Sequence, residues 1–189
     1  MKTVLLIRHG ATAGNLERRY IGRTDEPLCP EGVKQIEALR EKQLAAQYIF
    51  VSPMRRAGET AEVLFPHQPH IVIDGLRETD FGMFEGKTAA ELSDDAAYQA
   101  WVDGWCRGPI PDGESKEKVA ERAAAAFLRA VDTVTEKSCA AFVTHGGVIM
   151  ALLERFGVGN ADFYDYHVKN GGYFRCLWDG KTLSILEKG

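Results

Sequence analysis

Short apolar runs without polar alternation recur along the chain, with helical periods between them. The runs cover residues 4–7, 48–51, 70–73 and 140–143. Continuous apolar segments of this length are typical of strands in an α/β sheet that are covered by helices on both faces. The pattern therefore predicts an α/β fold.

Helix signals fill the intervals between the first three runs. Pro30 begins one predicted helix, and its apolar stripe continues to Leu44. Ser52 and Pro53 predict the start of the next helix, with Ser52 as the cap and Pro53 at the first helical position. Each helix would connect two parallel strands.

The second half of the chain carries three further signals. Ser115 is expected to cap the longest helix, because apolar side chains follow it at helical spacing. Another helix follows Gly147 and ends at Gly157. Residues 173–178 and 182–186 flank an Asp-Gly pair, which favours a hairpin and adds antiparallel strands to the sheet.

Residues 79–113 do not follow this alternation. They are rich in aromatic residues and glycine, and they contain one short helix signal at Thr88-x-x-Glu91. The segment is interpreted as a lid-like insertion that covers a site. A satellite hydrophobic cluster under a long loop is the alternative, and composition alone favours neither.

Length and composition limit the function classes. A chain of 189 residues fits one domain, which we expect to span residues 1–189. The formal net charge of -4 and the pI of about 5.8 argue against a nucleic-acid partner and against an anionic membrane surface.

Cysteine usage and the first residues predict a location. The chain has four cysteines, and no two of them form a C-x-x-C pair, so neither a zinc site nor a disulfide framework is expected. The first apolar run stops at Arg8, which makes it too short for a signal peptide or a membrane span. A cytoplasmic protein is predicted.

Charged and imidazole side chains gather at the predicted strand ends and first helical turns. The candidates are Arg8, His9, Arg56, Glu78 and His145. Because the carboxyl ends of the strands form the ligand crevice in open α/β sheets, these residues can converge. A neutral imidazole can attack phosphorus, guanidinium groups can neutralise the phosphoryl oxygens, and a carboxylic acid can protonate the leaving alkoxide. The set predicts phosphoryl transfer.

Other interpretations of these residues stay open. Asp80 is a rival to Glu78 as the acid, and Arg56 fits a solvated helix start. No H-x-H or H-x-x-x-H spacing and no nearby carboxylate pair supports a metal at His9 and His145. Three histidines outside the pattern are expected to be surface or core residues: His67, His70 and His167.

Six segments carry a more specific signal through their spacing. They are Arg8-His9-Gly10-Ala11-Thr12-x-x-Asn15, Gly22-x-x-Asp25-x-Pro27-Leu28, Ser52-Pro53-Met54-Arg55-Arg56-Ala57, Glu78-x-x-Phe81-Gly82-x-x-Glu85-Gly86, Pro111-x-Gly113-Glu114-Ser115 and His145-Gly146. Together they resemble the histidine phosphatase superfamily, also called the phosphoglycerate mutase-like family. The resemblance implies a three-layer α/β/α sandwich with a mainly parallel mixed sheet, a phosphohistidine intermediate, and neither metal nor cofactor.

The resemblance also assigns roles. It implies that His9 is the nucleophile and that Arg8 and Arg56 form the phosphate clamp. His145 becomes the second histidine of the phosphate pocket, and Glu78 becomes the proton donor.

Further substrate contacts are implied at Thr12, Asn15, Gly22 and Gly146. The chain departs from the family pattern at Cys29, where relatives usually carry a Thr or Ser helix cap. That departure removes no catalytic group.

Within the family, the residues favour hydrolysis of a small-molecule phosphomonoester. Between Glu78 and Ser115 the only cations are Lys87 and Arg107. The aromatic residues there are suited to stacking on a planar or apolar leaving group, and they are Phe84, Tyr98, Trp101 and Trp105.

Narrower alternatives remain. The segments that begin at Gly22 and Pro111 are similar to those of α-ribazole phosphatases, which act in cobalamin biosynthesis. A phosphoglycerate mutase, a broad-specificity small-metabolite phosphatase and a non-catalytic phosphate sensor are the alternatives. A homodimer is also left open.

Overall fold

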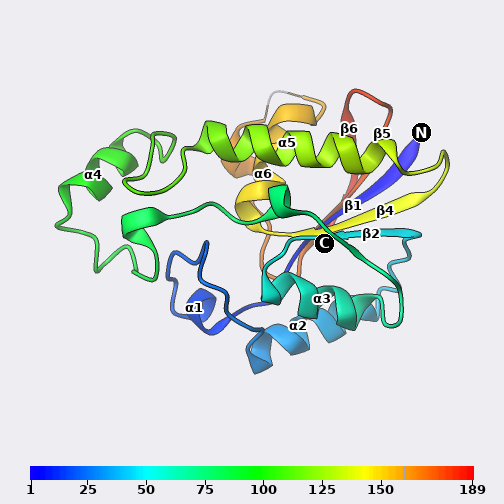
Figure 1. Ribbon diagram of the computed structural model, residues 1–189, viewed down its shortest axis with the longest axis horizontal. Coiled ribbons are helices and arrows are strands. Elements are labelled where there is room, and N and C mark those ends of the chain that lie inside the picture. The colour runs from blue at the N-terminus through cyan, green and yellow to red at the C-terminus, as the bar shows by residue number, and fades with distance from the viewer. Residues whose placement is uncertain (160) are drawn as a thin grey trace.

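A mixed sheet lies at the centre of the computed structural model, which describes residues 1–159 and 161–189 (Figure 1). Within these residues the strands are β1 (Lys2–Arg8), β2 (Tyr48–Val51), β3 (Ile71–Val72), β4 (Cys139–Thr144), β5 (Tyr173–Trp178) and β6 (Leu183–Lys188). The helices are α1 (Ala13–Leu16), α2 (Pro30–Arg40), α3 (Arg55–Leu64), α4 (Ala96–Asp103), α5 (Lys116–Asp132) and α6 (Gly146–Phe156). Short 3₁₀ turns are η1 (Asp74–Leu76), η2 (Gly82–Phe84) and η3 (Phe163–Tyr166).

The strand order is β3-β2-β4-β1-β5-β6. The strands β3, β2, β4 and β1 are parallel, whereas β5 and β6 form the expected antiparallel hairpin. The parallel strands therefore end at the same edge of the sheet. This confirms the predicted α/β fold with a mainly parallel mixed sheet.

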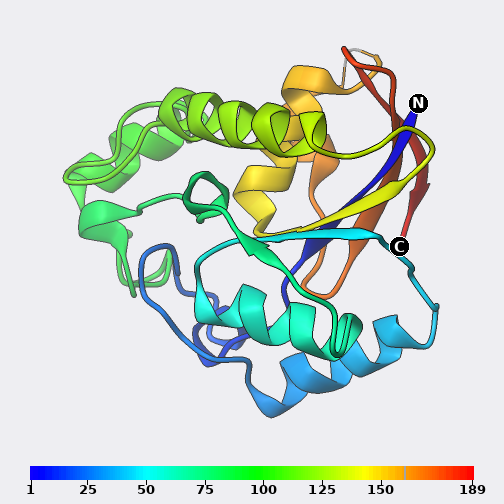
Figure 2. The same ribbon diagram turned by 45° about the vertical axis from the view of Figure 1, so that its right-hand side comes forward.

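Helices cover both faces of the sheet, as Figure 2 shows. Along β1, the side chains of Val4 and Leu6 join the core under α5 and α6, whereas those of Leu5 and Ile7 join the core on α2 and α3. Alternate residues of a strand point to opposite faces, so a continuous apolar run is needed when both faces are covered. The three-layer arrangement follows.

Two helix starts behave as the sequence predicts. Ser115 caps α5, and its hydroxyl oxygen accepts a hydrogen bond from the Lys118 amide. Cys29 replaces the usual hydroxyl at the start of α2, where its sulfur accepts from the Gly32 amide at 3.4 Å. The departure at Cys29 therefore preserves the cap.

The expected start of α3 at Ser52 and Pro53 is wrong. The helix begins at Arg55, and Met54 precedes it without a side-chain cap. The Ser52 hydroxyl is instead within 2.7 Å of the His145 ring. A tertiary contact has overridden the local capping signal.

Two other local predictions are corrected. The run at residues 70–73 is not covered on both faces, because β3 is the edge strand and Ile71 and Val72 are each 57% exposed. Thr88 and Glu91 make the reciprocal hydrogen bonds of a capping box, but these close a turn, and α4 begins later after Asp95.

The segment at residues 79–113 forms a separate hydrophobic cluster. Its buried members are Phe84, Leu92, Tyr98 and Ile110. The satellite cluster considered from the sequence is therefore present, and side chains from the same segment also line a cavity described below. The single-domain organisation over residues 1–189 stays a prediction. No helix among the described residues is long and apolar enough to cross a membrane.

Candidate active site

The candidate residues converge at the carboxyl edge of the parallel strands. Arg8 is the last residue of β1 and His9 follows it, while His145 lies between β4 and α6. Because β1 and β4 are adjacent, the rings of His9 and His145 come to 5.0 Å between centroids. Arg56 lies on the first turn of α3, and Glu78 lies on the segment after η1.

The His9 ring is held in one tautomer. Its Nδ1 lies 2.6 Å from the Gly10 carbonyl oxygen, an acceptor, so the hydrogen-bond network assigns the proton to Nδ1. Nε2 is then an acceptor, and it receives the Nε–H of Arg56 at 3.3 Å. Burial, with the nearby Arg56 charge, holds the pKa of His9 well below its usual range. The imidazole is therefore neutral, with its lone pair on Nε2.

Arg56 is fully buried, and backbone oxygens hold its other nitrogens. Nη1 donates to the Thr24 carbonyl at 2.8 Å, and Nη2 donates to the Gly22 carbonyl at 2.9 Å. Burial lowers the pKa of Arg56, but a guanidinium in a protein stays protonated. The loop that contains Gly22 thus positions a permanent charge beside His9.

His145 is also buried and neutral, because burial and then His9 lower its pKa well below the usual range. The Ser52 hydroxyl oxygen accepts from the Met54 amide, so its own hydrogen is free for His145 Nε2 at 2.7 Å. Nε2 is then the acceptor, which places the ring proton of neutral His145 on Nδ1.

Two buried nitrogens have no hydrogen-bond partner among the described residues. They are Arg8 Nε and His145 Nδ1. Arg8 is fixed by its Nη1, which donates to the Val168 carbonyl at 2.7 Å. A buried donor without a partner costs about 1–3 kcal/mol, and a cluster of such donors beside a guanidinium is suited to an anion.

Glu78 is oriented by backbone donors. Its Oε1 accepts from the Thr79 amide at 2.8 Å, and its Oε2 accepts from the Gly147 amide at 3.3 Å. A Cβ at residue 147 would lie 2.6 Å from Oε1, so glycine is needed there for the carboxylate to approach. Asp80, the other candidate for the acid, accepts a hydrogen bond from the Gly82 amide and does not line the cavity. The geometry favours Glu78 as the acid.

Arg122 of α5 holds the segment that carries Glu78. It donates to the carbonyl oxygens of Arg77 at 2.7 Å and Glu78 at 2.9 Å, and it makes two hydrogen bonds with Glu114. Glu114 in turn accepts from the Asp80 amide at 3.0 Å. Sequence reasoning missed Arg122, because no motif marks it, whereas Glu114 belongs to the quoted Pro-x-Gly-Glu-Ser segment.

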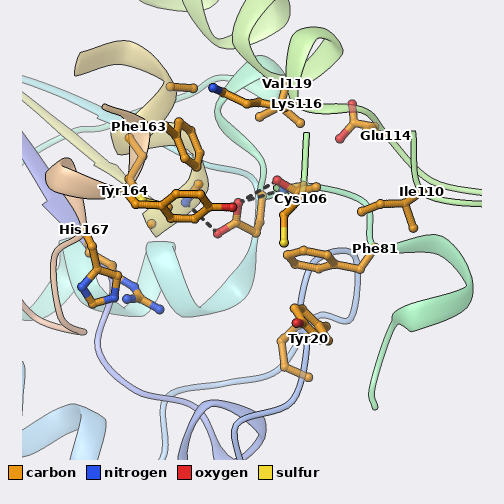
Figure 3. A pocket seen from close by; sticks show the side chains of 18 of the residues that line it. Tyr20, Phe81, Cys106, Ile110, Glu114, Lys116, Val119, Phe163, Tyr164 and His167 are labelled. Carbon is orange, nitrogen blue, oxygen red and sulfur yellow. Dashed lines mark hydrogen bonds between the residues drawn. The ribbon is translucent and has the colours of Figure 1, made fainter. Parts of the chain in front are cut away.

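A cavity of about 350 Å³ is lined by Arg8, His9 and Glu78, whereas Arg56 and His145 are fully buried and do not belong to its lining. Figure 3 shows Phe163 and Tyr164 on one side of it, facing Phe81 and Ile110 on the other. Its wall also includes Trp101, Cys106, Val119 and Met150. The segment at residues 79–113 thus supplies part of the wall.

The implied substrate contacts divide into two groups. Asn15 and Gly146 line the cavity. Thr12 is buried and caps α1, with reciprocal hydrogen bonds to Asn15. Gly22 donates its amide to Glu85 and gives its carbonyl to Arg56, so it contacts the clamp rather than the cavity. The roles of all these residues stay predictions.

The structure corrects two expectations about the cavity wall and adds to a third. His167 is exposed, as expected of a surface residue, and it also lines the cavity. The wall is not as poor in cations as the insertion sequence indicates, because Arg19 and Lys116 reach it from elsewhere in the chain. Trp105 is 76% exposed and lies outside the lining, whereas Trp101 belongs to it.

Metal ligands do not gather in this site. Among the described residues there is no group of three or more His, Cys, Asp or Glu side chains that could hold a metal ion. The metal-free chemistry expected from the sequence stays a prediction.

Known proteins resemble this chain in sequence and in fold. A curated protein named probable phosphoglycerate mutase GpmB, from Proteus mirabilis, is 35% identical over 159 residues, which are 81% of this chain and 74% of that protein. A solved phosphoglycerate mutase from Thermus thermophilus has a TM-score of 0.76 at 30% identity and covers 98% of this chain and 97% of its own. The α-ribazole phosphatase from Shigella flexneri has a TM-score of 0.86, with 97% and 94% coverage; at 24% identity it supports the fold alone.

The family itself is shown by a match to the histidine phosphatase superfamily (branch 1) over residues 4–188. This match extends beyond the motifs and includes the C-terminal hairpin. The resemblance inferred from the sequence is confirmed, and the chain belongs to the histidine phosphatase superfamily.

Proposed function

We propose that this chain is a metal-independent phosphomonoester hydrolase that acts through a phosphohistidine at His9. The observation that carries the proposal is the pair of buried nitrogens on Arg8 and His145 that have no partner among the described residues and lie beside a neutral imidazole. A phosphoryl group placed there would meet the donors that its oxygens need. The Nε–H of Arg56, which donates to His9 Nε2 in the free protein, would then donate to a phosphoryl oxygen and leave the Nε2 lone pair free to attack. Arg8 and Arg56 supply two positive charges against a phosphate dianion.

The reaction has two steps. His9 Nε2 attacks phosphorus, the bond from phosphorus to the ester oxygen breaks, and Glu78 in its acid form gives a proton to the leaving alcohol. Water then attacks the phosphohistidine, the bond from phosphorus to nitrogen breaks, and the Glu78 carboxylate takes a proton from the water. Arg8, Arg56 and the Nδ1–H of His145 stabilise the phosphoryl oxygens throughout.

Phosphoglycerate mutase is the second candidate, and the names of the curated relatives favour it. A mutase must bind a carboxylate as well as a phosphate. In this cavity the cations beyond the clamp, Arg19 and Lys116, are each ion-paired with a carboxylate of the chain itself. The remaining wall is largely apolar, which favours hydrolysis of an ester with an apolar or planar leaving group.

Among such esters we favour α-ribazole 5′-phosphate, a planar heterocycle with a single phosphate. The support is the aromatic wall and the fold shared with α-ribazole phosphatases. A cytoplasmic location and a homodimer stay predictions.

The buried histidines should make stability depend on pH. Their folded pKa values lie below the unfolded value of about 6.5. As pH falls through that value, the two histidines take up protons in the unfolded chain but stay neutral in the folded chain. The free energy of unfolding should therefore fall by up to about 1.4 kcal/mol per pH unit for each histidine. Urea unfolding between about pH 7.5 and 5.5 measures the slope. His9→Asn should reduce it, and His67→Asn at an exposed site should not. An unchanged slope in His9→Asn would show that the imidazole is not held neutral.

His9 should carry the phosphoryl group. Acid quenching during turnover of a labelled substrate should trap an acid-labile, base-stable phosphoryl group, and His9→Ala should abolish both the label and turnover. The same label should form in the presence of EDTA, because Arg8, Arg56 and His145 replace a metal in neutralising charge. Near-native turnover of His9→Ala, or activity that EDTA removes and one divalent ion restores, would contradict the mechanism.

The loss of rate on replacing Glu78 should grow with the basicity of the leaving group. Glu78→Gln should slow hydrolysis of alkyl phosphates by roughly 10²–10⁴-fold, the range typical of general-acid catalysis. It should slow nitrophenyl phosphate far less, since nitrophenolate leaves without a proton. Asp80→Asn is the matched control and should show no such dependence. Equal losses on both ester types would point to another proton donor.

Trp101, rather than Trp105, should contact a planar leaving group. Trp101→Ala should lower kcat/KM for α-ribazole 5′-phosphate by about 1–3 kcal/mol in transition-state free energy, as for other stacked bases, and should affect small esters much less. Trp105→Ala should affect neither, because its ring lies outside the cavity lining. Equal losses on large and small esters would indicate that Trp101 only supports the hydrophobic cluster.

A further inference from the structure

The cations of the cavity wall and of the phosphate clamp behind it fall into two classes. Arg8 and Arg56 have no carboxylate within 4.0 Å among the described residues, whereas Lys116 and Arg19 are each ion-paired. The uncompensated charge of the site is therefore concentrated at the phosphate clamp. The wall that would meet the rest of the substrate holds cations whose charge is already balanced.

Lys116 is held by an ion pair with a carboxylate and by a cation–π contact. Its Nζ lies 2.6 Å from Glu154 Oε1 and 4.5 Å from the centroid of the Phe163 ring. The Lys116 side chain is 14% exposed and that of Glu154 is 31% exposed, so bulk water screens the pair only in part. The ammonium keeps hydrogens that can still donate to a neutral acceptor, since it has three in all.

Arg19 repeats the arrangement at another part of the wall. Its Nε lies 2.7 Å from Glu17 Oε2, and its Nη1 lies 2.9 Å from Glu91 Oε2. Nη1 also donates to the Gly86 carbonyl at 2.8 Å. These contacts hold Arg19 against the insertion rather than leaving it for a ligand.

We propose that Glu154 determines the substrate class by neutralising Lys116, so that the site accepts phosphomonoesters of uncharged alcohols and rejects those with a second anionic group. This inference rests on the proposed function, because it concerns the leaving group of the same reaction. A carboxylate that approached Lys116 would lie beside the Glu154 carboxylate, and the repulsion between them offsets the attraction of the ammonium. A hydroxyl or carbonyl oxygen meets no such repulsion.

The neighbouring Tyr164 fits the same substrate class. Burial, together with the nearby Cys106 thiol, raises the pKa of Tyr164 to about 12, so its hydroxyl stays neutral. It lines the cavity and donates to the Trp105 carbonyl oxygen at 3.4 Å, so its oxygen can still accept a hydrogen bond from an uncharged polar group. Lys116, Tyr164 and the apolar side chains together present a wall for a leaving group that is partly apolar and carries no charge.

The test compares two esters with similar carbon skeletons. Glycerol 3-phosphate ends in a neutral hydroxymethyl group, and 3-phosphoglycerate ends in a carboxylate. Phosphate release gives kcat/KM for each, and their ratio reports the selectivity against the second charge. In Glu154→Gln the ratio of kcat/KM for 3-phosphoglycerate to kcat/KM for glycerol 3-phosphate should rise roughly tenfold. The reason is that removing the negative charge of Glu154, which repels the substrate carboxylate, changes kcat/KM by on the order of one decade.

Two controls connect the change to Lys116. Glu117→Gln removes one negative charge from an exposed position of α5 and should leave the ratio as in the wild type. The double variant Lys116→Met with Glu154→Gln should not show the rise in the ratio, because it lacks the Lys116 ammonium that would attract the substrate carboxylate. If Glu154→Gln does not fold, Lys116→Met alone carries the test, since it leaves Glu154 uncompensated and should lower the ratio.

The outcomes separate this inference from the proposed function. An unchanged ratio in Glu154→Gln, an equal rise in Glu117→Gln, or a gain that survives in the double variant would overturn the role of Glu154 while phosphatase activity remained. If the wild-type protein releases phosphate from neither ester nor from nitrophenyl phosphate, the proposed hydrolase itself fails and this inference fails with it.

Discussion

The buried charge of Arg56 is the constraint on which the rest of the site depends. A cation removed from water is costly unless it is hydrogen-bonded and paired, yet this guanidinium has only backbone carbonyls and the His9 ring as partners among the described residues. The fold supplies the hydrogen bonds and leaves the balancing anion to the ligand. The same charge helps to keep His9 neutral and therefore nucleophilic.

The hydrogen bonds that hold Arg56 also connect the phosphate clamp to the cavity wall. The carbonyls of Gly22 and Thr24 accept from Arg56, while the amides of the same two residues donate to Glu85 at 2.8 and 2.9 Å. Glu85 belongs to the insertion and also accepts from the Phe81 amide, whose ring lines the cavity. A change in the insertion can therefore reach the clamp through one carboxylate, without a contact between substrate and Glu85.

The sequence predicted the fold and the convergence of the candidate residues because these signals are local. Arg8, His9 and His145 directly follow apolar runs, and strand ends in a parallel sheet converge by topology. Local signals failed where distant partners competed: the Ser52 hydroxyl contacts His145 instead of capping α3. Lys116 and Arg122 could not be found, because only the packing of α5 determines which way its side chains point. The paired state of Lys116 likewise depends on Glu154, which lies 38 positions away.

Catalysis requires both substrate binding and product release, and the positions of the free and the paired cations bear on each of these steps. The donors of Arg8 and His145 that lack a partner among the described residues cost stability in the free protein, and a bound phosphoryl group would offset that cost. Inorganic phosphate would meet the same donors after hydrolysis. The cavity wall around it contains Lys116 and Arg19, whose charges are already balanced by carboxylates of the chain. A free cation on that wall would provide a second place for phosphate to bind, so the pairing that limits the leaving group to uncharged alcohols also favours release of the product.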